Sequence, residues 1–176
     1  LAAMRTTGTA LAVTGAMMMG AAVILAWPRA DLLIAVGVTN CAILVVVAVV
    51  GRLPILHIAA VGCLALAALV GFHAVQGDLS GAGAQPGWDL ARVLVAGHSA
   101  AVLAVLSVAA GGVAFALRRA KYRLDALSYL WGAAGLAAIS VLVAAWAGFG
   151  PGGDSNWATP VFGFYAVASI AAAGLF

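Results

Sequence analysis

Residues 32–51 read LLIAVGVTNCAILVVVAVVG, an apolar run without a charged side chain. An α-helix of about 20 such residues is long enough to cross the hydrocarbon core of a bilayer. Further apolar runs lie on both sides of it, at 9–27, 54–75, 90–117, 124–148 and 159–176. The sequence therefore predicts an all-α fold, a polytopic transmembrane bundle of about six helices that forms a single domain over residues 1–176.

The composition argues against a soluble fold. Of 176 residues, 66% are hydrophobic and only 7% are charged, whereas a soluble domain is about 45–50% apolar and about 25% charged. A soluble fold of this size needs a charged outer surface that this chain cannot supply. The lipid bilayer is therefore the predicted partner, and a cell membrane, crossed several times, is the predicted location.

Short polar segments separate the apolar runs. Asp31 is placed to cap the helix 32–51 through its side-chain oxygen, and Pro54 suits the first turn of the next helix. The segments 77–87 and 149–156 are rich in Gly and contain Pro, which indicates loops. The small residues Gly15, Gly20, Gly62, Gly97, Gly111, Gly112, Gly132 and Gly135 are expected to let helices pack closely.

The basic residues predict the orientation, because loops on the cytoplasmic side carry an excess of Lys and Arg. The segment after the run 90–117 holds Arg118, Arg119, Lys121 and Arg123, and we expect it to be cytoplasmic. Alternation of the helices then places Arg5, Arg52 and the N-terminus on the same side. Arg29 and Arg92 fall on the opposite side.

Histidines are the candidate ligands for a cofactor. His73 near the end of one predicted helix and His98 in the next could face each other and ligate a haem iron, hold a metal or form a pH-sensitive pair. The two histidines lie at different depths, because His73 is near the end of its predicted helix whereas His98 lies about 12 Å into the next one. The alternative is an interfacial His73 and a His98 hydrogen-bonded between helices. His57 lies about 24 Å from His73 along the same helix and cannot share its site.

Two further polar residues are candidate sites. Asn40 lies about 12 Å into its helix, where it needs a partner from another helix or a ligand. Arg92, beside Asp89, could reach the outer interface, pair with Asp89 or bind an anion. Several hydroxyl side chains can bond to carbonyls of their own helices and need no functional role: Thr14, Thr39, Ser99, Ser107, Ser140 and Ser169.

Several function classes lose support at this point. The net charge of +3 follows membrane topology, and the chain has no basic face with aromatic residues for a nucleic acid. Cys41 and Cys63 do not form a CxxC pair. Enzymatic activity is the least supported class, because no motif groups a nucleophile with an acid and a base; no catalytic residue is predicted.

The leading hypothesis is a membrane-embedded sensory or anchoring region of a larger protein. The chain ends at Phe176 inside an apolar run, so we expect a truncated C-terminus and a missing cytoplasmic domain or partner subunit. One alternative is a haem- or metal-binding membrane subunit that uses His73 and His98. Another is a small transporter or an accessory subunit of a membrane complex, with a polar cavity around Asn40 and His98.

Overall fold

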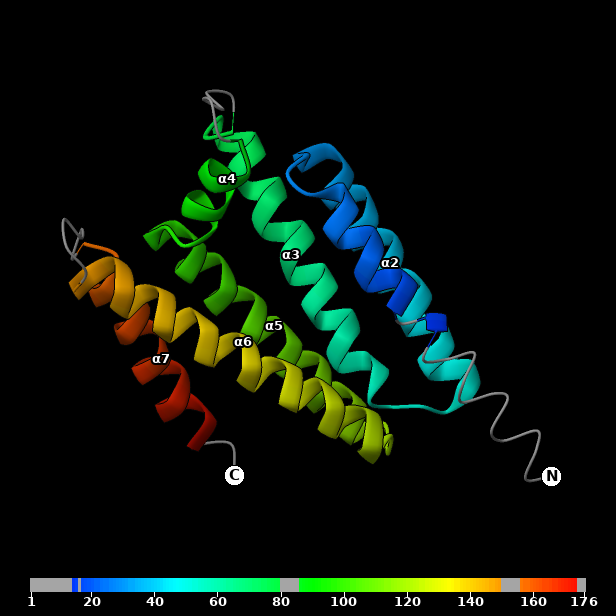
Figure 1. The fold of residues 1–176 in the computed structure, drawn as a ribbon. Helices are drawn as coiled ribbons and strands as arrows, with labels where there is room; N and C mark the ends of the chain where they lie inside the picture. Colours follow the sequence, from blue (N-terminus) through cyan, green and yellow to red (C-terminus); the bar gives the residue numbers. More distant parts are fainter. Residues whose placement is uncertain (1–13, 16, 80–85, 150–155, 174–176) are drawn as a thin grey trace.

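The structure, a computed structural model, describes residues 14–15, 17–79, 86–149 and 156–173. These residues form helices and connecting turns, and the predicted all-α bundle is confirmed (Figure 1). An N-terminal helix covers Met17–Ala26. It is followed by α2 (Ala30–Gly51), α3 (Leu56–Gln76), α4 (Pro86–Leu94), α5 (Gly97–Arg119), α6 (Arg123–Phe149) and α7 (Ala158–Ala173). Arg5 and the ends of the predicted helices 9–27 and 159–176 lie outside the described residues.

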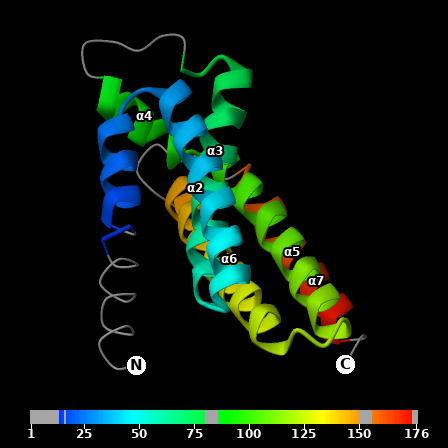
Figure 2. The same ribbon diagram turned by 90° about the vertical axis from the view of Figure 1, so that its right-hand side faces the viewer.

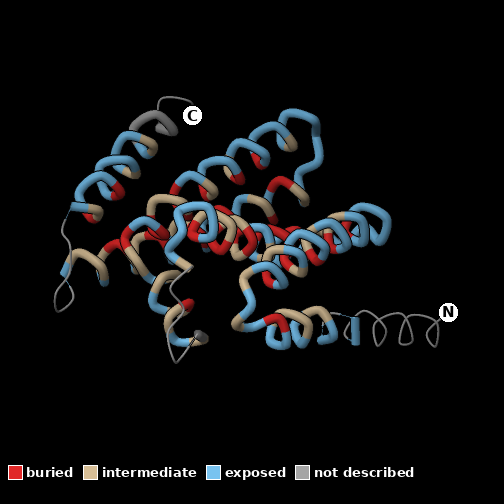
Figure 3. The backbone as a smooth tube through the Cα atoms, turned by 90° about the horizontal axis from the view of Figure 1, so that it is seen from above, coloured by how far each residue is buried: buried red, intermediate tan, exposed pale blue. Residues whose placement is uncertain are grey.

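Four of these helices, α2, α3, α5 and α6, are long and apolar enough to cross a membrane. The N-terminal helix and α7 are apolar but shorter in the part of the chain that is described. Only 28% to 33% of each of the four candidate spans is buried inside the chain, and Figure 3 shows exposed residues along the outer sides of the helices. Such exposed apolar surface fits contact with lipid.

Successive long helices run in opposite directions (Figures 1 and 2). We call one end of the bundle the upper end, as in Figure 1; it holds the turn at residues 27–29, the end of α3 and α4. The lower end holds the turns at residues 52–55 and 120–122. This alternation is the arrangement expected of helices joined by short connections across a bilayer.

The helix α3 lies at the centre of the packing. It packs along α2 on one side and contacts α5 and α6 on the other, while α5 packs along α6. Val61, Leu103 and Leu136 belong to the core where α3, α5 and α6 meet. Leu33 and Val70 belong to a second core shared by the N-terminal helix, α2, α3 and α4.

Close contact between helices depends on fewer glycines than the sequence suggested. A Cβ atom on Gly37 of α2 would lie 2.9 Å from the Ala67 Cβ and 3.0 Å from the Cys63 carbonyl oxygen. Of the predicted packing glycines, Gly97 and Gly132 face a neighbour, so the prediction was wrong for the six that have no atom within 4 Å of an added Cβ: Gly15, Gly20, Gly62, Gly111, Gly112 and Gly135. In a chain this apolar, composition does not reveal which face of a helix is inward.

Three helices end in the same way. After α2, α3 and α5, a residue in the left-handed region is followed by an N–H that donates to the carbonyl five residues earlier, as in a Schellman motif. The left-handed residues are Arg52 (φ 52°), Gly77 (φ 82°) and Lys121 (φ 69°). The hydrogen bonds are Leu53 to Ala48 at 2.9 Å, Asp78 to His73 at 3.1 Å and Tyr122 to Leu117 at 2.9 Å. Only one of the three positions carries the usual glycine.

The predicted helix 90–117 is two helices in the structure. The chain is extended at Ala96 (φ −69°, ψ 158°), which separates α4 from α5. A Cβ on Gly97 would lie 2.7 Å from the Trp157 Cβ, so the start of α5 packs tightly against the residue that precedes α7. The predicted cap at Asp31 was also wrong, because α2 begins earlier and the Asp31 carboxylate pairs with Arg29 at 2.7 Å.

We expect Gly37→Ala and Gly62→Ala to change stability in opposite directions. The first forces α2 away from α3 and should cost roughly 1–3 kcal/mol as an overpacking change. The second meets no neighbour and should stabilise by roughly 0.5–1 kcal/mol, because alanine is the better residue in a helix. Unfolding in detergent micelles measures both, and equal effects would contradict the packing described here.

Candidate functional site

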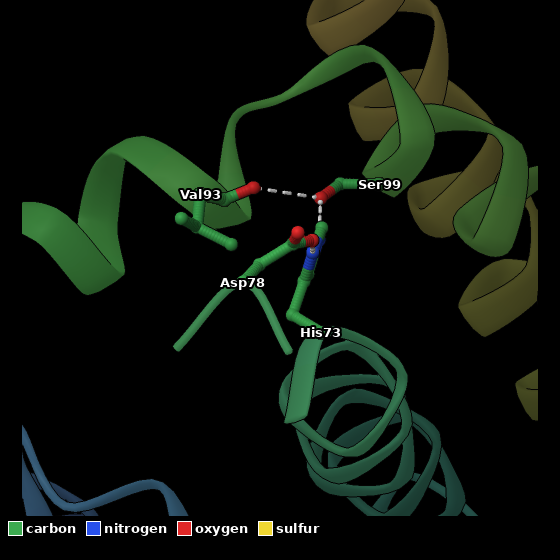
Figure 4. A network of polar contacts seen from close by, with 4 residues as sticks. All are labelled: His73, Asp78, Val93 and Ser99. Carbon is green, nitrogen blue, oxygen red and sulfur yellow. Dashed lines mark hydrogen bonds and ion pairs between the residues drawn. The ribbon is translucent and has the colours of Figure 1, made fainter. Parts of the chain in front are cut away.

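The ring of His73 is completely buried near the end of α3. Both of its nitrogens have a polar partner (Figure 4). Nδ1 lies 2.7 Å from the Asp78 Oδ2, and Nε2 lies 2.8 Å from the Ser99 Oγ. A buried polar group is stable only when such partners are present, and these side chains form the most connected polar cluster among the described residues.

The end of α3 explains why Asp78 meets His73. Gly77 takes the left-handed conformation, and the chain turns back so that the Asp78 N–H reaches the His73 carbonyl. In a Schellman motif these two positions lie side by side, and they usually carry apolar residues that touch. Here they carry a carboxylate and an imidazole, so the same turn produces a His–Asp pair.

The break between α4 and α5 explains the position of Ser99. Its side chain lies in the first turn of α5, and its Oγ is 3.1 Å from the Val93 carbonyl oxygen at the end of α4. Its N–H donates to the Ala96 carbonyl at 2.9 Å. Ser99 therefore connects the end of α4, the start of α5 and the end of α3 through His73. An unbroken helix over 90–117 would not have brought these groups together in this way.

The partners of His73 accommodate both of its protonation states. An ionised Asp78 only accepts hydrogen bonds, so Nδ1 carries a proton. In the neutral ring, Nε2 accepts from the Ser99 hydroxyl, and the Val93 carbonyl keeps its bond from the Ala96 N–H at 3.1 Å. In the imidazolium, Nε2 donates to Ser99 and the hydroxyl turns to donate to Val93. The two states differ by one proton on Nε2 and by the rotation of the Ser99 O–H bond.

The contacts follow the order of a Ser–His–Asp triad, in which the histidine links a serine to an orienting aspartate. No motif in the sequence predicts such a grouping, because Asp78 and Ser99 meet His73 only through the two turns described above. Ser99 itself is 0% exposed, so its oxygen is not open to a substrate. In this structure the Ser99 hydroxyl serves as a hydrogen-bonding partner of His73 and of the Val93 carbonyl.

His57 forms a second His–Asp pair at the lower end of α3. Its Nε2 lies 3.3 Å from the Asp125 Oδ1 of α6, and its ring stacks on Tyr129 at 4.8 Å. Among the described residues, nothing hydrogen-bonds its buried Nδ1. If Nδ1 carried a proton in addition to the one on Nε2, it would be a buried hydrogen-bond donor without an acceptor. Such a donor lowers the stability of the fold. Nε2 is therefore the ring nitrogen placed to donate a hydrogen bond, and Asp125 is its acceptor.

The residues singled out from the sequence lie in separate places. His98 is exposed and its ring contacts Trp157 at 4.5 Å, although it directly precedes Ser99. A haem or metal bound by His73 would displace Asp78 or Ser99 from a ring nitrogen. No group of three or more His, Cys, Asp or Glu side chains in the described part of the chain could hold a metal.

Asn40 and Arg92 also take separate positions. The Asn40 Nδ2 donates to the Met19 carbonyl at 3.2 Å, which is the interhelical hydrogen bond that we expected as one interpretation. Arg92 is exposed in the last turn of α4. Ser107 bonds to its own helix at Ala104, as predicted. The prediction was wrong for Ser140, which donates across to the Ala100 carbonyl of α5 at 2.7 Å, and for Ser99.

No known protein family, curated protein or solved structure matches this chain. The contacts described above define one site, the His73 site, made of His73, Asp78, Ser99 and the Val93 carbonyl.

We expect Ser99→Ala to destabilise the protein by about 1–3 kcal/mol, because it leaves the buried Nε2 of His73 without a partner. The control is Ser107→Ala, which removes a hydroxyl that bonds mainly within its own helix and should cost less than about 1 kcal/mol. Unfolding in detergent micelles compares the two. An equal cost would show that the bond to His73 adds nothing to stability.

Proposed function

We propose that this chain is a membrane-embedded sensory region that responds to protons at the upper end of the bundle. The chain crosses the membrane six times, with the N-terminus and the lower end on the cytoplasmic side. The observation that carries the sensory role is the buried His73, whose partners accept both protonation states.

The helix directions and the basic residues support the six crossings. The N-terminal helix and α7 are apolar and alternate in direction with their neighbours, as the four longer helices do. Among the described residues, the lower end carries Asp125 with five basic residues, which are Arg52, Arg118, Arg119, Lys121 and Arg123. The upper end carries Arg29 and Arg92 with Asp31, Asp78 and Asp89. This distribution favours a cytoplasmic lower end.

Solvent reaches the His73 site through Asp78, whose side chain is 43% exposed while that of His73 is 1% exposed. Asp78 is the charged group in contact with the ring, on the turn that follows α3. From α5 the ring meets the neutral Ser99. One turn earlier on α3, Val70 packs against apolar residues of α2 and α4. A proton taken up from the outer solvent is therefore held by one carboxylate and one hydroxyl.

The proton would act on the junction between α4 and α5. Its uptake reverses the hydrogen bond between His73 and Ser99 and directs the Ser99 hydroxyl to Val93. The helix α5 begins at this junction and runs to the basic turn at the lower end. A change in the hydrogen bonds at the first turn of α5 can therefore be transmitted along this helix to the cytoplasmic end. A sensory region requires such a connection between its two ends.

The two alternatives receive less support from the same contacts. Haem or metal binding by His73 and His98 requires a free nitrogen on His73, and both nitrogens are engaged. Transport through a polar cavity at Asn40 requires an available amide, and this one is bonded to Met19.

Labelling of introduced cysteines tests the orientation. In a chain with Cys41 and Cys63 replaced by alanine, we expect Arg29→Cys to react with an impermeant thiol reagent on intact cells. Lys121→Cys should react only after the membrane is permeabilised. Both positions are exposed, so the reverse pattern would overturn the proposed topology.

Hydrogen exchange tests the sensory role. After correction for the intrinsic effect of pH on exchange, we expect amides at residues 95–100 to change their protection severalfold between roughly pH 5 and pH 8, the range in which histidine titrates. His73→Gln should abolish this change, because glutamine does not take up a proton. His98→Gln is the matched control and should retain it. A pH response that survives His73→Gln would reject His73 as the sensor.

A further inference from the structure

We propose that the lower end carries a docking surface for the headgroups of anionic phospholipids. This lower basic surface consists of two turns, one with Arg52 and one with Arg118, Arg119, Lys121 and Arg123. The inference uses the membrane-spanning character of the helices, and it does not depend on the proton response of His73.

All five basic side chains belong to exposed residues. Among the described residues, Asp125 is the acidic residue at this end, and its carboxylate is turned toward the buried His57 at 3.3 Å. The surface that faces outward is therefore strongly positive. Phosphodiester groups are the natural partners of such clusters where a helix leaves the hydrocarbon.

Two of the five basic residues lie at positions where the backbone conformation is unfavourable for an L side chain. Arg52 and Lys121 both take the left-handed conformation, which an L side chain disfavours and glycine accepts freely. The equivalent position after α3, at the upper end, carries Gly77. At the lower end, a basic side chain therefore occupies each of two positions where glycine would fold more easily.

The two turns are held together by the packing beneath them. The contact between His57 and Asp125 joins the first turn of α3 to the first turn of α6, directly behind the surface. Around the basic groups, Tyr122 is 61% exposed and the Arg119 guanidinium lies 4.7 Å from the centre of the Phe115 ring. Aromatic side chains beside basic ones are characteristic of the headgroup layer of a membrane.

The expected ligand is a lipid phosphodiester with a net negative charge. Each basic residue near an anionic bilayer strengthens binding by about fivefold. Phosphatidylglycerol supplies this chemistry, whereas the headgroup of phosphatidylcholine carries a compensating positive charge. The surface should therefore prefer the first lipid.

The test uses the full chain in neutral detergent micelles, titrated with short-chain phosphatidylglycerol or phosphatidylcholine. We expect binding of phosphatidylglycerol to be at least about tenfold tighter. Lys121→Gly and Arg52→Gly should each weaken it about fivefold while the thermal stability without lipid stays equal or rises, because the left-handed strain is removed. Lys121→Arg should keep full affinity, and Arg29→Gln at the upper end is the control that leaves binding unchanged.

Three results would overturn the proposal. Equal binding of the two lipids would remove the preference for negative charge. Full affinity in both glycine variants would show that these side chains do not contact the lipid. Inorganic phosphate that stabilises the protein as well as phosphatidylglycerol does, at the same phosphate concentration, would identify a free anion as the ligand. The pH response of His73 has no bearing on any of these outcomes.

Discussion

The absence of hydrogen-bonding solvent in hydrocarbon is the constraint on which this structure depends. Each polar group inside the apolar layer must find its partner within the chain. The backbone meets this requirement by forming helices. The side chains meet it through a few bonds between helices, such as Asn40 to Met19 and Ser140 to Ala100. His73 meets it with two partners, and the identity of those partners gives the site its chemistry.

The helix α3 carries a histidine paired with an aspartate at each end, yet the two pairs differ in what they can do. His73 has partners on both nitrogens, so it can gain a proton without leaving a donor unpaired. His57 has a partner on one nitrogen, so a proton on its Nδ1 would be a buried donor without an acceptor. The first pair links the end of α3 to the junction between α4 and α5 through Ser99. The second joins α3 to α6 and holds the lower turns in place.

The three left-handed helix ends show how one backbone motif serves two purposes. At the upper end glycine allows the turn that brings Asp78 to His73. At the lower end the same motif carries Arg52 and Lys121, and it presents positive charge where the helices end. The difference in charge between the two ends of the bundle is therefore built partly into the turns themselves.

The sequence by itself determined the class of fold, the main apolar helices and the unequal distribution of charge, because apolar runs and basic loops are local features. It also contained the signal for the pair of His73 and Asp78, since Gly77 after an apolar run predicts a left-handed helix end. It did not determine the break before Gly97, the position of Ser99 or the inward glycines. These helices are apolar on nearly all sides, so residues that face lipid and residues that face the core look alike. Only the packing of α3, α4 and α5 against one another decided which polar groups met.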